Sequence, residues 1–189
     1  MPTYAFQGRR FWLPPMGVAG ADLGGLGLAR AAHPLLGAVV ERPDSGAVVL
    51  TGRLSLAAQP WLGDHAVAGV VLFPGAGFVE LALRAGDEVG CSVVDELTLL
   101  APLVLPAADA VQVQVVVGAA ASSGGNANRR SVSVYSRGTQ SDSDWVLHAE
   151  GGLSTDAGNP VADLSVWPPV GAIAVDVADA YQQLTGRGY

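Results

Sequence analysis

Hydrophobic and polar residues alternate along much of the chain, and this period of two predicts half-buried antiparallel strands. The alternation is clearest at residues 111–118 and 129–136, which contain Val-Gln-Val-Gln-Val and Ser-Val-Ser-Val-Tyr. Shorter apolar runs between turn residues predict further strands. Together the expected strands are residues 35–42, 47–56, 67–73, 92–99, 111–118, 129–136 and 145–153. The Pro-Asp-Ser-Gly at 43–46 predicts a hairpin turn between the first two strands.

One segment, residues 76–85, has the period of a helix. Its apolar residues recur at i, i+3, i+4 and i+7, as Phe78, Leu81, Ala82 and Ala85. The opposite face is also apolar, with Val79 and Leu83, so we expect this helix to be wrapped by sheet. A second helix is expected to start within 175–184. One buried helix among antiparallel strands is an α+β architecture, and a hot-dog fold, a curled antiparallel sheet around one central helix, fits best.

Composition narrows the possible partners. The 189 residues suffice for one domain with a sizeable core, because half of them are hydrophobic. The net charge is −7 and no basic stripe exists, so nucleic acid is not an expected partner. The single cysteine, Cys91, excludes an internal disulfide or a multi-cysteine metal site. We find no long apolar run and no signal peptide at the N-terminus, so we expect no membrane span and a cytoplasmic location.

The candidate chemistry lies at His65, which begins the pattern H-x-x-x-G-x-x-x-x-P through Gly69 to Pro74. Histidine has an ordinary pKa of about 6.5, so it can exchange a proton near neutrality. The pattern leads directly into the expected helix, whose first N–H groups at Gly75 to Gly77 could face a polarised carbonyl. This arrangement suits a general base.

Gly69 would leave room for an acyl chain or expose a backbone N–H. In an extended strand it would lie roughly 13 Å from His65, at about 3.3 Å per residue. If both residues touch substrate, His65 must therefore lie on the preceding loop. Asp64 is either an orienting carboxylate or a solvated loop residue, and we favour the second. His33, just before an expected strand, and His148, within one, are weaker candidates for catalysis.

Several motifs together resemble the N-terminal part of a dehydratase domain from a modular type I polyketide synthase. The segment 61–80, which contains His65, is similar to that family's signature almost throughout. The segments 33–37 (His-Pro-Leu-Leu-Gly), 97–105 and 148–153 (His-Ala-Glu-Gly-Gly-Leu) are similar as well. Residues 1–13 resemble the end of the linker that follows an acyltransferase domain.

The resemblance implies a double hot dog in which each half contributes one catalytic residue. The family's histidine corresponds to His65, the general base, and its acid is an aspartate of the second half. Residues 1–30 would be a linker, 31–155 the first hot dog, and 156–189 a connector with the start of the second. Gly69, Pro74, Gly75 and Gly77 would bind substrate.

The implied reaction removes water from a β-hydroxyacyl thioester on the phosphopantetheine of an acyl carrier protein, without a metal or a cofactor of its own. The implied partners are that carrier protein, the neighbouring synthase domains, the second hot-dog half and a second copy in a parent homodimer. Two alternatives stay open. One is a non-catalytic structural or dimerisation module, and the other is a homodimeric hot-dog hydratase or thioesterase.

Overall fold

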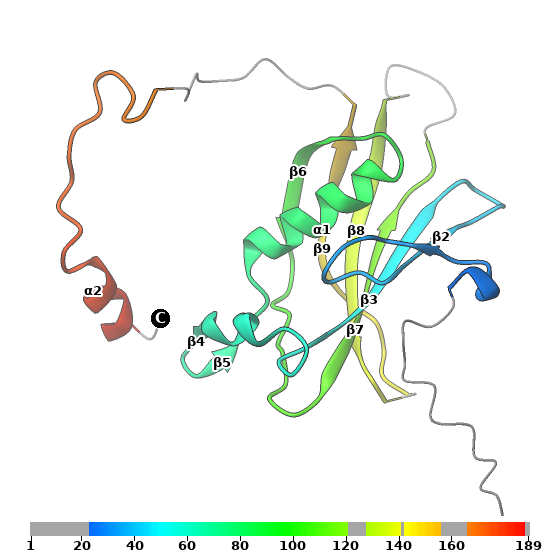
Figure 1. Ribbon diagram of the computed structural model, residues 1–189, viewed down its shortest axis with the longest axis horizontal. Helices are drawn as coiled ribbons and strands as arrows, with labels where there is room; N and C mark the ends of the chain where they lie inside the picture. Colours follow the sequence, from blue (N-terminus) through cyan, green and yellow to red (C-terminus); the bar gives the residue numbers. More distant parts are fainter. Residues whose placement is uncertain (1–22, 121–127, 141, 156–165, 188–189) are drawn as a thin grey trace, which may run out of the picture.

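A seven-stranded antiparallel sheet forms the centre of the computed structural model, which describes residues 23–120, 128–140, 142–155 and 166–187. The strand order is β1-β2-β3-β7-β8-β9-β6, with one long helix, α1 (Gly75–Asp87), lying along one face (Figure 1). The strands are β1 Ala29–Arg30, β2 Ala38–Glu41, β3 Val48–Ser55, β6 Val93–Leu99, β7 Ala110–Val117, β8 Arg129–Gly138 and β9 Val146–Ser154. This architecture confirms the α+β, hot-dog prediction.

The core lies between α1 and the concave face of the sheet. Phe78 and Leu81 of α1 are almost fully buried, as are Val113 and Val115 of β7. These positions follow the helical and strand periods of the sequence, so each element presents one apolar side to the other. Full burial of such a side chain is worth about 1.5–3 kcal/mol relative to exposure. The packing therefore fixes α1, and with it the chain entering its N-terminus, against the sheet.

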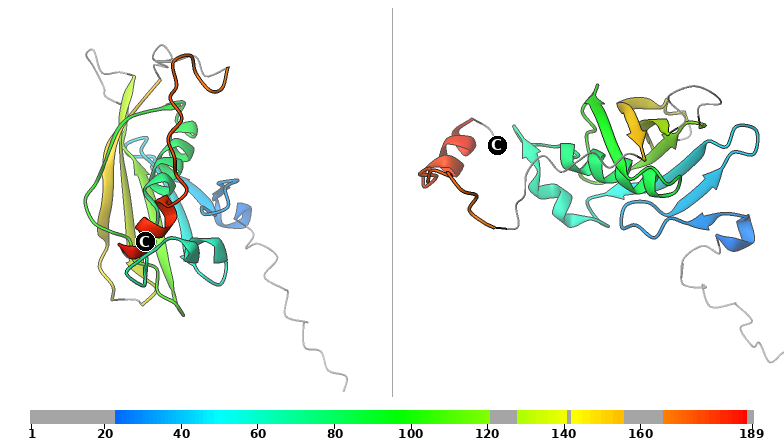
Figure 2. Two further views of the ribbon diagram at one scale, coloured as in Figure 1. Left: turned by 90° about the vertical axis from the view of Figure 1, so that its left-hand side faces the viewer. Right: turned by 90° about the horizontal axis from the view of Figure 1, so that it is seen from above.

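The prediction that sheet wraps α1 on both sides is wrong. Val79 on the opposite face is 41% exposed, and Leu83 is half-buried. Figure 2 shows why: the sheet covers only one side of the helix. Within the described ranges no second layer packs over Val79.

The single strand predicted at 67–73 is instead a tight hairpin. Its strands are β4 (Ala66–Val67) and β5 (Val70–Val71), joined through Ala68 and Gly69. Both turn residues have a positive φ, 50° and 80°. Two consecutive residues in this region form the two-residue turn whose twist suits a hairpin, and glycine accepts that backbone without strain. The apolar run therefore reverses direction where a strand was expected to continue.

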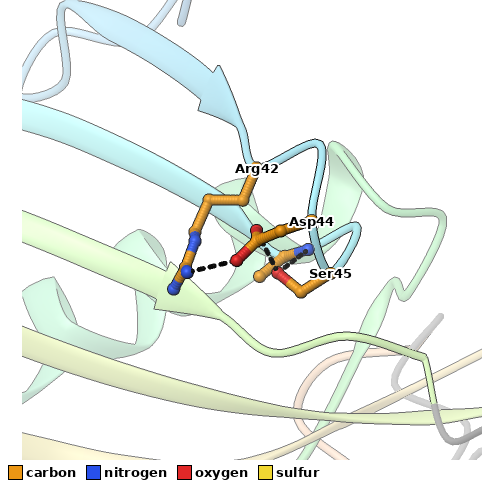
Figure 3. Close-up of polar contacts among 4 residues, drawn as sticks. Arg42, Asp44 and Ser45 are labelled. Atoms are coloured by element: carbon orange, nitrogen blue, oxygen red, sulfur yellow. Dashed lines mark hydrogen bonds and ion pairs between the residues drawn. The ribbon is translucent and has the colours of Figure 1, made fainter.

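The predicted turn between β2 and β3 is confirmed, and Figure 3 shows its polar contacts. The Asp44 carboxylate accepts a hydrogen bond from Arg42 Nη2 at 2.7 Å and one from Ser45 Oγ at 3.0 Å. Ser45 Oγ accepts one from the N–H of Ala47 at 3.4 Å. The Arg42 hydrogen bond, followed by that of Ser45, lowers the pKa of the Asp44 carboxyl below its ordinary value.

Other boundaries shift by a few residues. β1 lies inside the segment expected to be linker, and the second helix, α2 (Ala180–Gly186), begins within the expected range 175–184. Short 3-10 helices occupy Gly24–Leu26 and Pro60–Asp64. Residues 1–22 of the expected linker, and residues 121–127, 141, 156–165 and 188–189, lie outside the described residues. No helix in the described part of the chain is long and apolar enough to cross a membrane.

Candidate active site

His65 stands between two local structures that hold its backbone. It directly follows the 3-10 helix Pro60–Asp64, and its N–H donates to the carbonyl of Leu62 at 3.3 Å. Leu62 is fully buried and anchors this turn to the core. The carbonyl of His65 accepts the N–H of Leu72 at 3.0 Å, because the β4–β5 hairpin returns the chain to His65. Chain reversal at Gly69 thus places His65 beside Leu72, seven residues later.

The same pairing determines the tautomer of the His65 ring. Nδ1 of His65 lies 2.9 Å from the carbonyl oxygen of Leu72. A carbonyl only accepts, so Nδ1 carries a hydrogen, and in the neutral ring Nε2 then keeps its lone pair. No described residue donates a hydrogen bond to Nε2. A neutral imidazole held in this way is ready to accept a proton through Nε2.

Asp64 has no hydrogen bond to this ring and its side chain is exposed. The orienting group is the Leu72 carbonyl, which sequence reasoning missed. A backbone acceptor leaves no side-chain pattern in a sequence, so only the hairpin geometry could reveal it.

A cavity of about 310 Å³ opens beside His65. This volume lies at the lower end of the range for small-molecule sites. Apart from His65, the lining side chains are all apolar: Leu72, Phe73, Phe78, Leu99, Leu100, Ala101 and Pro102. His65 itself is exposed at the cavity. The arrangement is that of one proton acceptor beside an apolar pocket of acyl-chain size.

Two phenylalanines form the part of the pocket next to α1. The rings of Phe73 and Phe78 pack edge to face, with centroids 5.0 Å apart at 87°. Gly77 allows this packing, because a Cβ at that position would lie 2.6 Å from the Phe73 ring. Gly77 therefore shapes the pocket through Phe73 and does not itself line the cavity.

The other predicted substrate-binding residues do not line the pocket. Pro74 caps α1 in an extended conformation, and its carbonyl accepts the N–H of Gly77 at 2.9 Å. Gly75 lies next to Leu99, which a Cβ at Gly75 would approach to 3.6 Å. Gly69 lies at the hairpin turn, where a Cβ would meet nothing within 4 Å. Its substrate contact stays a prediction, while its positive φ already explains why glycine suits the turn.

The remaining histidines have structural partners. His33 Nδ1 accepts the N–H of Leu35 at 3.1 Å, and its Nε2 lies 3.4 Å from the Glu80 carboxylate. His148 is buried, with both ring nitrogens within hydrogen-bond distance of partners. Neither lines the cavity. Across the described residues, no three His, Cys, Asp or Glu side chains gather as a metal site.

Comparison with known proteins gives one consistent family. Residues 33–137 match the family described as "Polyketide synthase dehydratase domain". A type I polyketide synthase of phenolphthiocerol synthesis from Mycobacterium marinum (strain ATCC BAA-535 / M) is 66% identical over 189 residues, covering all of this chain and 9% of that protein. The mycoketide-CoA synthase of Mycobacterium tuberculosis (strain ATCC 25618 / H37Rv) is 65% identical over 189 residues, covering all of this chain and 4% of that protein.

A solved structure is similar as well. The crystal structure of the dehydratase domain from the terminal module of the rifamycin polyketide synthase has a TM-score of 0.79 and 49% sequence identity. The match covers 89% of this chain and 60% of that one. The chain thus spans less than a tenth of the two curated relatives and about three fifths of the solved dehydratase domain.

Proposed function

The chain belongs to the polyketide synthase dehydratase domain family, and on this premise we propose that it forms the histidine-bearing half of a β-hydroxyacyl thioester dehydratase. The observation that carries the proposal is the His65 ring. Its Nδ1–H is held by the Leu72 carbonyl, and its Nε2 is left to accept a proton beside an apolar cavity.

In the proposed reaction, Nε2 of His65 takes the α-proton of the acyl thioester. The C–H electrons form the new C=C bond through an enolate-like state, in which the thioester oxygen holds the charge. The C–O bond to the β-hydroxyl then breaks, and an acid protonates the departing group to water. N–H groups at the start of α1, near Gly75, are suited to stabilise the thioester oxygen, with Gly69, Pro74 and Gly77 completing the binding region.

The acid is proposed to be an aspartate of a second hot-dog half beyond residue 189, as the family resemblance implies. The substrate would be carried by the phosphopantetheine of an acyl carrier protein, with no cofactor bound to this chain. We also keep as proposals the neighbouring synthase domains and a second copy as partners, a cytoplasmic location, and the division into 1–30, 31–155 and 156–189. The apolar lining of the cavity supports an acyl substrate.

Replacing His65 tests the proposal. In the complete dehydratase region of the natural protein, His65→Ala is expected to lower kcat by about 10²–10⁴-fold, the usual contribution of a general base. The measurement is conversion of a β-hydroxyacyl pantetheine thioester to the enoyl product. Asp64→Ala is the matched control, because Asp64 adjoins His65 but has no hydrogen bond to its ring; it should keep near-normal turnover.

Normal turnover by His65→Ala would reject His65 as the base. Absence of dehydration in the unaltered region would instead favour a structural or dimerisation module. Hydrolysis of the thioester without dehydration would favour a hot-dog thioesterase.

A further inference from the structure

The cavity wall facing His65 lies beyond the end of the sheet. The β6–β9 ladder ends with Leu99 opposite Ala149. The next three residues, Leu100, Ala101 and Pro102, all line the cavity. Because this segment lies beyond the ladder, its backbone needs hydrogen-bond partners outside the β6–β9 pairing.

His148 of β9 supplies those contacts with both its backbone and its ring. Its carbonyl accepts the N–H of Leu100 at 2.8 Å and that of Ala101 at 3.4 Å. Its Nδ1 lies 3.1 Å from the carbonyl oxygen of Ala101. Because that carbonyl only accepts, Nδ1 carries a hydrogen, and in the neutral ring Nε2 accepts the Ser136 hydroxyl hydrogen at 2.7 Å. The side chain is 4% exposed, so both ring hydrogen bonds are made inside the protein.

The segment held by His148 continues to the base. Leu103 accepts the N–H of Phe73 at 2.9 Å, and Leu105 donates to the carbonyl of Val71 at 3.0 Å. Leu72, which lies between these two partners, provides the carbonyl that orients the ring of His65. The stretch from Leu99 to Leu105 therefore connects the end of β6 to the His65 hairpin, and His148 anchors its first half.

We propose that His148 is a positioning residue for the dehydration reaction: through its Nδ1–H bond to Ala101 it fixes the Leu100–Pro102 wall, and so sets how long acyl chains fit beside His65. Ser136 acts through His148 by holding the tautomer in which Nδ1 is the donor. This inference rests on the proposed function, since it concerns the same cavity.

A pair of amide variants separates the two ring contacts. The amide nitrogen of asparagine can take the place of Nδ1, whereas the amide of glutamine reaches the place of Nε2. His148→Asn can therefore keep the hydrogen bond to the Ala101 carbonyl and lose the one to Ser136. His148→Gln can keep the hydrogen bond to Ser136 and lose the one to Ala101. Ser136→Ala removes only the hydroxyl and leaves His148 in place. All three are made in the complete dehydratase region.

The readout is kcat/KM for two pantetheine thioesters, β-hydroxybutyryl and β-hydroxydecanoyl, corrected for the folded fraction of each variant. We expect His148→Gln to lose about tenfold more activity on the long substrate than on the short one, the effect of one lost hydrogen bond on the wall. His148→Asn should keep the wild-type ratio of the two substrates, and Ser136→Ala should fall between them. Equal losses on both substrates by Asn and Gln variants would show a merely structural histidine and overturn the inference.

Amide hydrogen exchange at residues 100–105 gives a second readout that needs no turnover. Exchange there should be faster in His148→Gln than in His148→Asn, and unchanged exchange in His148→Gln would overturn the inference. If the unaltered region does not dehydrate either substrate, the proposed function fails, while the exchange data still decide whether His148 anchors the wall.

Discussion

At the scale of single residues, the histidines of this chain differ in how many ring nitrogens already have partners. His33 and His148 use both nitrogens on neighbouring groups, so their rings are committed to structure. His65 uses only Nδ1, on the Leu72 carbonyl, and lies at an apolar cavity. That difference, rather than burial or charge, makes His65 the candidate base.

Gly77 is a residue whose missing side chain shapes the pocket. Gly77→Ala would place a Cβ 2.6 Å from the Phe73 ring, which cannot retreat easily because it is buried and packed edge to face on Phe78. Overpacking of this kind costs about 1–3 kcal/mol, against at most about 1 kcal/mol gained from helix propensity. We expect a lower free energy of unfolding in urea denaturation and a higher KM for the acyl substrate.

The matched control for this substitution is Gly75→Ala in the same turn of α1. A Cβ there would make an ordinary 3.6 Å contact with Leu99, so the free energy of unfolding should stay the same or rise. Equal stability of the two variants would contradict the role given to Phe73.

At the scale of elements, the β4–β5 hairpin brings Leu72 back to His65. Gly69→Ala would force a side chain into a φ of 80°, which costs about 1–2 kcal/mol for an L-residue. We expect a clear loss of kcat in the complete dehydratase region, because the turn holds the Leu72 carbonyl against Nδ1 of His65. Melting temperature should change less, since the hairpin is partly exposed and lies outside the main sheet.

Two controls accompany this prediction. Gly69→Asn should retain more activity than Gly69→Ala, because asparagine tolerates the left-handed region better. Gly63→Ala, at a glycine without positive φ and with open space around it, should behave like wild type. Full activity of the Gly69→Ala variant would show that this turn is not needed to orient His65.

The β2–β3 turn makes a pH-dependent contribution to stability. The pKa of Asp44 is lowered in the folded protein below its ordinary value of 3.8, chiefly by the hydrogen bond from Arg42. Its stabilising effect is therefore fully present above pH 3.8 and is lost as the pH falls through the lower folded pKa. Urea unfolding of wild type and Asp44→Asn should differ most near neutrality and converge as the pH falls below the folded pKa of Asp44. A gap that persists at low pH would show that the carboxylate charge is not responsible.

At the scale of the whole molecule, the apolar cavity is open on a side that described residues do not cover. Leu99, Leu100 and Val104 near it are each half exposed, at 53%, 50% and 50%. The chain covers 60% of the solved rifamycin dehydratase domain. Under the proposed function, a second hot-dog half completes the wall and supplies the acid. The site in this chain would then hold the base alone.

The corresponding prediction compares two lengths of protein. Under the proposed two-half site, the 189-residue chain by itself should convert a β-hydroxyacyl pantetheine thioester at least about 10²-fold more slowly than the complete dehydratase region, because the proposed acid belongs to the other half. The enoyl product is followed by its absorbance, with His65→Ala in the longer protein as the background. Comparable rates from both lengths would contradict the two-half site.

The sequence by itself determined most strands of the main sheet and the α1 helix, and it singled out His65 as the candidate base. The periods of two at 111–115 and of 3.6 at 78–85 are local properties of the chain, because the direction of each side chain follows from backbone geometry within a few residues. The H-x-x-x-G-x-x-x-x-P pattern likewise contained His65 and the start of α1. These features needed no knowledge of what lies far away in the chain.

Only the tertiary structure decided the partners of His65. The reversal at Ala68 and Gly69 turned an expected strand into a hairpin, and it made the Leu72 carbonyl the group that orients His65. The wall at Leu100 to Pro102 depends on His148, almost fifty residues away along the chain. Every residue has the same backbone carbonyl, so the group that orients the His65 ring has no signature in the sequence. Distant segments meet only in the folded sheet, so the pocket wall has no signature in the sequence either.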